Sequence, residues 1–307
     1  MPVNGNERIS ACRFSRFSLG RMGPAAYSAC MSRAVPIAWP LAEGFSVRKA
    51  IQCAHLVEAA YDLYQQWSDA GKPPREEMVF RPVARGALEL ADPFWRTLTY
   101  RQARTGSGGK GGPRFVTRTE ATPAGVCARR GDRLFIVFRG TQSAGEKISN
   151  SMAGKLDAVF DDLPDGGVHR GFHRCYESVR PAIRAFLEAH ATDRSRICAT
   201  GHSLGGALAF LTAMDIATGG LPYRALEVFT FAAPLVGSAR WARHFARQRL
   251  AAWRIANRRD VVTKLPPAWL GYRAAGVAVE FTSADGLPPH SLDQTYLPAL
   301  RAARAGH

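Results

Sequence analysis

Short apolar runs alternate with amphipathic stretches through the second half of the chain. Runs of strand length lie at 134–138, 196–200, 225–232, 250–256 and 277–281. Stretches with hydrophobic residues at helical spacing lie at 171–190, 203–218 and 238–249. A continuous apolar run such as 134–138 is typical of a strand that is buried on both faces. The alternation therefore predicts an α/β fold, with a mostly parallel central sheet and helices on both faces.

One more helix is predicted ahead of these units, over residues 46–67. Ser46 can serve as its N-cap, and Gly71 together with two prolines ends it. Its hydrophobic positions recur at helical spacing, at Ile51, Ala54, Val57, Tyr61 and Tyr64. The pattern predicts an amphipathic helix that packs one face against the sheet.

The domain organisation follows from length and local composition. A chain of 307 residues allows one large domain or two small ones. We interpret residues 1–44 as a disordered or leader-like tail and 45–307 as one domain, in which the glycine-rich segment 104–113 is a flexible loop. No apolar run reaches the roughly 18 residues of a membrane span, which excludes an integral helical membrane protein.

The chain is strongly basic, with 41 Lys and Arg against 25 Asp and Glu, a formal charge of +16. Such a balance favours anionic partners. Residues 238–259 carry seven Arg and no acid, and a helix there would place Arg240, Arg243 and Arg247 on one face. This face is either simply solvated or a patch for peripheral contact with an anionic membrane surface. No nucleic-acid recognition motif is present, so a nucleic-acid partner is not expected.

The six cysteines and the N-terminal residues carry few further signals. No two cysteines form a CxxC pair, so neither a zinc ribbon nor a redox motif is predicted. Cys198 lies in an apolar strand, where we expect a buried free thiol. The first 42 residues hold five Arg and one acid but lack the clean apolar stretch of a signal peptide. A cytoplasmic or peripheral membrane location is therefore favoured over secretion.

The sequence Gly201-His202-Ser203-Leu204-Gly205 fits the pattern G-x-S-x-G between a predicted strand and a predicted helix. A sharp strand-to-helix turn exposes the serine hydroxyl and directs the helix N-terminus at a developing oxyanion. The two flanking glycines leave out side chains that would clash in that turn. Ser203 is therefore the predicted nucleophile; the alternative is an N-cap serine.

A serine nucleophile needs a histidine base and a carboxylate that orients it. Downstream, His290 follows two prolines in a loop after the last predicted strand, whereas His244 lies in the Arg-rich helix and His307 ends the chain. Asp260 comes directly after a strand, at the sheet edge where sites form in such folds. We predict His290 as base and Asp260 as its partner. Asp215, Glu227 and Glu280 are less suitably placed, and Asp285 is the second choice for the acid.

An oxyanion hole needs two donors, one from the residue after the nucleophile and one from the loop after an earlier strand. Leu204 supplies the first. The strand 134–138 leads into Arg139-Gly140-Thr141, so Thr141 is predicted to supply the second, with its N–H and its hydroxyl.

Four separated segments resemble the class 3 lipases of the α/β-hydrolase superfamily: IVFRGT at 136–141, VHRGFH at 168–173, TGHSLGGALA at 200–209 and NRRDVVTKLP at 257–266. The resemblance spans about 130–298 and also takes in the helix 46–67. It implies hydrolysis of ester bonds in acylglycerols, with Ser203, Asp260 and His290 as triad and with Thr141 and Leu204 as oxyanion donors. Neither a metal nor another cofactor is expected.

Three other functions are compatible with the same sequence features. A phospholipase acting on anionic membranes would suit the arginine excess, and a small-molecule esterase or thioesterase would use the same triad. A non-catalytic lipid-binding module is the alternative outside enzymes. The segment 142–167 has hydrophobic residues on one helical face, which indicates either a lid or a docked helix. His169 and His173 are interpreted as structural because a third metal ligand is missing.

Overall fold

The computed structural model describes residues 41–305, apart from 82, 84–87, 105–113, 142–159 and 162–165. Its central sheet has seven strands in the order β1-β2-β3-β6-β7-β9-β11. The last five of these run parallel to one another: β3 (Arg133–Phe138), β6 (Arg196–His202), β7 (Ala225–Phe231), β9 (Ala251–Asn257) and β11 (Val277–Phe281). The predicted α/β fold with a mostly parallel sheet is confirmed.

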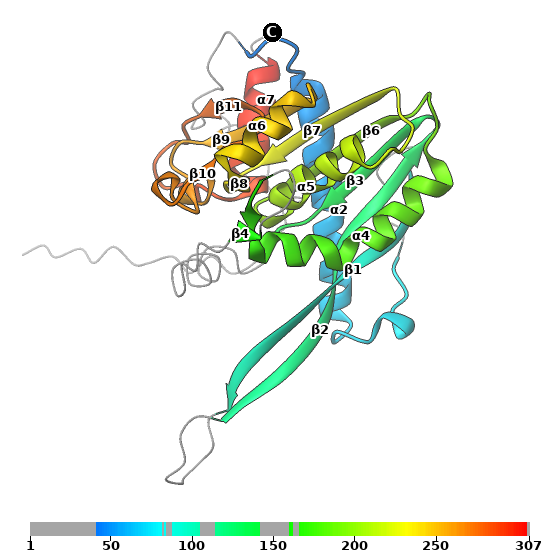
Figure 1. Cartoon of the computed structure of the whole chain (residues 1–307). Helices are drawn as coiled ribbons and strands as arrows, with labels where there is room; N and C mark the ends of the chain where they lie inside the picture. Colours follow the sequence, from blue (N-terminus) through cyan, green and yellow to red (C-terminus); the bar gives the residue numbers. More distant parts are fainter. Residues whose placement is uncertain are drawn as a thin grey trace, which may run out of the picture.

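Helices cover both faces of this sheet (Figure 1). One face packs on α2 (Val47–Asp69) and α7 (Leu297–Ala305), which meet each other over a buried apolar cluster. The other face packs on α4 (Arg170–His190) and α5 (Leu204–Thr218). The predicted cap is present, since Ser46 Oγ accepts a hydrogen bond from Lys49 N–H. Because α5 is buried almost all round, it is a core helix rather than a surface one.

A long antiparallel pair, β1 (Glu89–Arg104) and β2 (Arg114–Arg130), forms one edge of the sheet and extends away from the body (Figure 1). The sequence pattern did not predict these strands, because they carry many Arg and Thr in place of a continuous apolar run. The proposed flexible loop 104–113 falls between them, and all but its first residue lies outside the described residues. The proposed tail 1–44 likewise lies almost entirely outside them, so the division into tail and domain stays a prediction.

A second, small sheet lies beside the main one, in the order β10 (Tyr272–Arg273), β8 (Gly237–Ser238), β5 (Val168–His169) and β4 (Phe160–Asp161). It joins the segments before α4, before α6 (Ala239–Arg247) and after β9. On α6, Trp241 and Phe245 are buried while Arg240, Arg243 and Arg247 are exposed, as the helical spacing predicted.

Candidate active site

Ser203 stands at a sharp turn between β6 and α5, with a positive φ of 57°. Such a backbone is strained for a residue other than glycine and persists only where its surroundings enforce it. A Cβ on Gly201 would lie 2.2 Å from the carbonyl oxygen of Gly205, and one on Gly205 would lie 2.5 Å from that of Arg139. The flanking glycines are therefore required by close backbone approach, as predicted.

Three side chains from distant parts of the chain form a continuous set of hydrogen bonds. Ser203 Oγ lies 2.9 Å from His290 Nε2, and His290 Nδ1 lies 2.7 Å from Asp260 Oδ2. Ser203 is fully buried, so its hydroxyl is not exposed to solvent as the turn pattern predicted, and the Asp260 side chain is 1% exposed. A buried carboxylate that accepts from Nδ1–H leaves Nε2 free to accept the serine proton. The structure thus brings together all three residues that the sequence singled out.

Asp260 is held for this role by two further donors. Tyr296 Oη donates to Asp260 Oδ2 at 2.8 Å, and the Val262 N–H donates to Oδ1 at 3.0 Å. Burial and the neighbouring carboxylate together raise the pKa of Tyr296 well above its usual range, so the phenol stays a donor. An ionised carboxylate is stabilised by such donors in a dry environment.

The rejected acids are engaged elsewhere. Each lies in an ion pair outside the triad: Asp215 with Arg180 and Arg184, Glu227 with Lys49, Glu280 with Arg258, and Asp285 with Arg259. Arg258 and Arg259, the basic residues next to Asp260 in sequence, pair with Glu280 and Asp285 rather than with Asp260. His244 lies on α6, away from this set of hydrogen bonds.

The backbone that carries His290 is fixed at three successive carbonyls. Those of Pro288, Pro289 and His290 accept hydrogen bonds from the side chains of Thr295, Asn257 and His202 respectively. Asn257 ends β9 and also receives the N–H groups of Arg259 and Ser283 on its Oδ1. These side chains orient the imidazole, and sequence reasoning did not assign them that role.

A second series of hydrogen bonds joins His202 to the loop after β3. Gly140 N–H donates to Tyr61 Oη at 2.9 Å, and Tyr61 Oη lies 2.8 Å from His202 Nδ1. His202 Nε2 lies 2.9 Å from the carbonyl of His290, which only accepts. Nε2 therefore carries the proton, and Nδ1 accepts from Tyr61. Helix α2 thus connects the predicted oxyanion loop to the backbone of the predicted base.

The loop that leads to Thr141 is tightly constrained. Buried Arg139 donates to the carbonyls of Pro123 and Gly140, at 2.6 and 2.7 Å, while its guanidinium stacks 3.8 Å above the Tyr64 ring. A Cβ on Gly140 would lie 3.0 Å from Ser203 Cβ. The residue before Thr141 therefore passes directly beside the nucleophile. Leu204 is the first residue of α5, where amide groups have no acceptor within the helix.

Replacing Tyr61 with Phe removes one hydroxyl and leaves both Gly140 N–H and His202 Nδ1 without their partner. We expect the free energy of unfolding to fall by about 1–3 kcal/mol. We also expect kcat on a soluble ester to fall between about tenfold and hundredfold, because the loop and the base lose their common support. Tyr64→Phe, one turn further along α2, is the matched control and should change kcat less than about twofold. Equal kcat in the two variants would contradict a positioning role for Tyr61.

His169 and His173 have structural roles. His169 Nδ1 accepts from the N–H groups of Gly171 and Phe172 and so caps α4, and His173 lies 3.8 Å from Glu177. Within the part of the chain that the structure describes, no group of three or more His, Cys, Asp or Glu side chains could hold a metal ion. The helices described there also include none long and apolar enough to cross a bilayer. The candidate lid, 142–167, lies mostly outside the described residues.

Comparisons with known proteins find similar sequences and a similar fold. The family described as Lipase (class 3) matches residues 135–269. A lipase from Rhizopus niveus is 33% identical over 150 residues, covering 47% of this chain and 37% of that protein. Phospholipase A1-II 4 from Oryza sativa subsp. japonica is 29% identical over 267 residues, covering 75% of this chain and 66% of that protein. The matched region thus spans well under half the length of the fungal relative.

A solved structure of Rhizomucor miehei triacylglyceride lipase has the same fold. It superposes with a TM-score of 0.55 at 20% identity, covering 83% of this chain and 94% of that one. The segment 135–269, which runs from β3 past Asp260, is thus similar to the class 3 lipases, and the chain has the α/β-hydrolase fold.

Proposed function

We propose that this protein is a serine lipase or esterase that hydrolyses carboxylic ester bonds of acylglycerol-type lipids. The observation that carries the proposal is the buried chain of hydrogen bonds from Ser203 through His290 to Asp260. The lipases to which this chain is similar support the ester class, and a secreted mono- and diacylglycerol lipase of Fusarium solani, 33% identical over 143 residues, supports glycerides.

The proposed reaction has two halves. Ser203 Oγ attacks the ester carbonyl while His290 Nε2 takes its proton, and His290 then passes that proton to the leaving alcohol. Asp260 holds the imidazole through Nδ1–H and stabilises its cation. Water next attacks the acyl-enzyme by the same route and releases the fatty acid and Ser203.

We assign the oxyanion hole to the N–H groups of Leu204 and Thr141. The developing charge lies at the N-terminus of α5, where the helix dipole favours an anion. The fixed geometry of Gly140, held by Tyr61 and Arg139, means that the loop donor needs little reorganisation during the reaction. Removing one such donor typically costs about 3–4 kcal/mol of transition-state stabilisation.

Two measurements test this proposal together. The protein is assayed on nitrophenyl esters from acetyl to palmitoyl, and it is treated with a fluorophosphonate that forms a covalent bond with activated serines. We expect hydrolysis that increases with chain length, and one phosphonate group per chain, mapped by mass spectrometry to Ser203. Ser238, an N-cap of α6, is the internal control and should remain unlabelled. Vesicle binding without hydrolysis or labelling would favour a lipid-binding module instead.

Phospholipids of anionic membranes are the second proposed substrate. The rice phospholipase A1 relative and the formal charge of +16 support this alternative. So does the segment after Asp260, where Trp269 is 78% exposed and Val261 is 56% exposed. Arg273 donates to the carbonyl of Ala268, next to Trp269. An exposed indole near a cation such as Arg273 is suited to the interface of an anionic bilayer.

Replacing Trp269 with Ala should weaken binding to vesicles of anionic phospholipid by roughly tenfold or more, since burying an aromatic side chain stabilises by about 1.5 kcal/mol or more. Sedimentation with vesicles measures the bound fraction. Val79→Ala provides the control, because Val79 is 87% exposed but lies near β1. Unchanged binding of Trp269→Ala would place the membrane contact elsewhere.

A further inference from the structure

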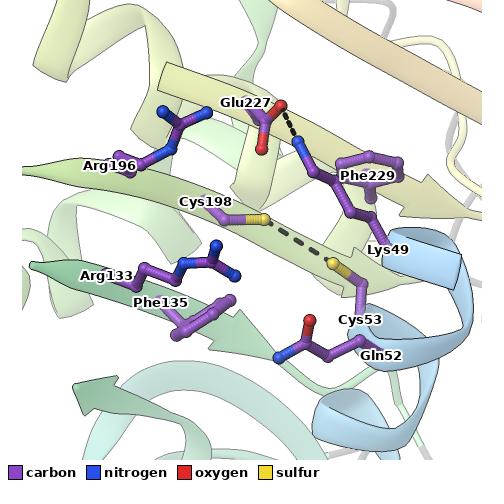
Figure 2. A pocket seen from close by; sticks show the side chains of 9 residues that line it. All are labelled: Lys49, Gln52, Cys53, Arg133, Phe135, Arg196, Cys198, Glu227 and Phe229. Carbon is purple, nitrogen blue, oxygen red and sulfur yellow. Dashed lines mark hydrogen bonds and ion pairs between the residues drawn. The ribbon is translucent and has the colours of Figure 1, made fainter. Parts of the chain in front are cut away.

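Two cysteines from distant parts of the chain meet at the end of the sheet where the parallel strands begin. Cys53 lies on α2 and Cys198 on β6, and their sulfur atoms are 3.6 Å apart. Both are free thiols and both are buried. Figure 2 shows the two sulfur atoms facing each other across the space between helix and sheet. A disulfide requires about 2.0 Å between sulfurs, so a small approach of α2 and β6 would suffice.

The thiols line a pocket rather than a sealed core. The cavity has a volume of about 50 Å³. Its other lining residues include three cations, Lys49, Arg133 and Arg196, and one carboxylate, Glu227, which pairs with Lys49 at 2.5 Å. A space of this size holds a few water-sized groups. It is too small to admit a disulfide-containing peptide as the oxidant. Among oxidants of thiols, a small hydroperoxide is compatible with this volume.

We propose that Cys53 and Cys198 form a peroxide-sensitive thiol pair that closes to a disulfide between α2 and β6. One thiolate attacks the peroxide O–O bond and becomes a sulfenic acid, while hydroxide leaves. The second thiol then attacks the sulfenic sulfur, the S–S bond forms, and water leaves. Overall, two thiols and one hydrogen peroxide give one disulfide and two waters. Lys49, the cation that opposes the raised pKa of Cys198, stabilises the thiolate and the departing hydroxide.

The charges around the pair set its pH dependence. The contact with Cys53 and burial raise the pKa of the Cys198 thiol well above its usual range, and Glu227 adds to this while Lys49 opposes it. Lys49 faces the thiols from α2, Arg133 from β3, Arg196 from β6 and Glu227 from β7. The thiolate of Cys198 is therefore scarce at neutral pH. We expect the oxidation rate to rise about tenfold for each pH unit above neutrality.

The disulfide would connect two elements that support the candidate site. β6 leads directly into Ser203, and α2 carries Tyr61. It would also close a loop of chain between two residues that are 145 positions apart, which restricts the unfolded state. We expect the midpoint of thermal unfolding to rise by roughly 5–10 °C on oxidation. This inference does not depend on the proposed lipase function.

Treating the full chain with hydrogen peroxide, then blocking free thiols and mapping peptides by mass spectrometry, tests the pair. The expected result is a Cys53–Cys198 link, reversed by dithiothreitol, together with the higher unfolding midpoint. Cys53→Ala should lose both, whereas Cys127→Ala, which removes another buried thiol on β2, should keep both. The proposal is overturned if the link does not form, if either cysteine links elsewhere, or if Cys53→Ala shows the same rise.

Discussion

Replacing Asp260 with Asn is expected to lower kcat on ester substrates by about 10⁴-fold while the fold is retained. The amide is nearly the same size, and its oxygen can still accept from Tyr296 or Val262. Its NH2 group, however, cannot accept from His290 Nδ1–H, so the imidazole adopts the tautomer that carries its proton on Nε2. That tautomer cannot take the Ser203 proton. Steady-state kinetics on a nitrophenyl ester, with circular dichroism to verify folding, measures the effect.

Asp285→Asn is the matched control for this variant. Asp285 was the second choice for the acid, and it forms an exposed ion pair with Arg259. Because exposed ion pairs contribute little, we expect kcat and the free energy of unfolding to stay close to the wild-type values. If Asp260→Asn retained more than about a tenth of the wild-type kcat, Asp260 would not be the residue that orients the base.

The residues of the proposed triad could be singled out because each lies next to an element with a strong local signal. Ser203 lies between an apolar strand and a helix within a glycine pattern that only a tight turn requires. Asp260 follows a buried strand, and parallel strands bring their carboxyl ends to one edge. His290 was selected by elimination among few downstream histidines. For Ser203 and Asp260 the information lies within about ten residues of the side chain, whereas for His290 it includes the positions of the other downstream histidines.

The supporting residues could not be predicted, because their partners are far away in sequence. Tyr61 occupies an ordinary hydrophobic position of an amphipathic helix, and its spacing says nothing of His202, which lies 141 residues further along. Tyr296 and Asp260 are 36 residues apart, and Asn257 reaches Pro289 across 32. Periodicity identifies the buried face of an element but not the polar group that this face meets.

The missed strands have a related explanation. β1 and β2 pair along their whole length, yet a large part of that length extends beyond the body of the molecule (Figure 1). Strands that are not covered on both faces need no continuous apolar run. Their stability depends on pairing with each other and with β3, which hydrophobic patterning alone does not reveal.

His202 should make the folded state lose stability as the pH falls from about 6.5 towards 4. Burial, reinforced by the nearby His290, lowers the pKa of His202 from 6.5 to about 3. Between these values the unfolded chain binds a proton that the folded chain does not bind. The contribution of neutral His202 to the stability of the folded state is therefore complete above pH 6.5, its pKa in the unfolded chain. It is lost progressively as the pH falls from 6.5 towards about 3, its pKa in the folded chain. At about pH 4 the loss amounts to roughly 3 kcal/mol, since each pKa unit corresponds to 1.36 kcal/mol.

Chemical denaturation of wild type and His202→Gln across this pH range measures the difference. Glutamine can still accept from Tyr61 and donate to the His290 carbonyl, but it does not titrate. Its stability should therefore decrease less steeply than that of the wild type, whatever its value at neutral pH. His244→Gln, on α6, controls for the loss of a histidine and should keep the wild-type slope. Equal slopes for His202→Gln and wild type would mean that His202 becomes protonated in the folded protein, with the loss of its bond from Tyr61.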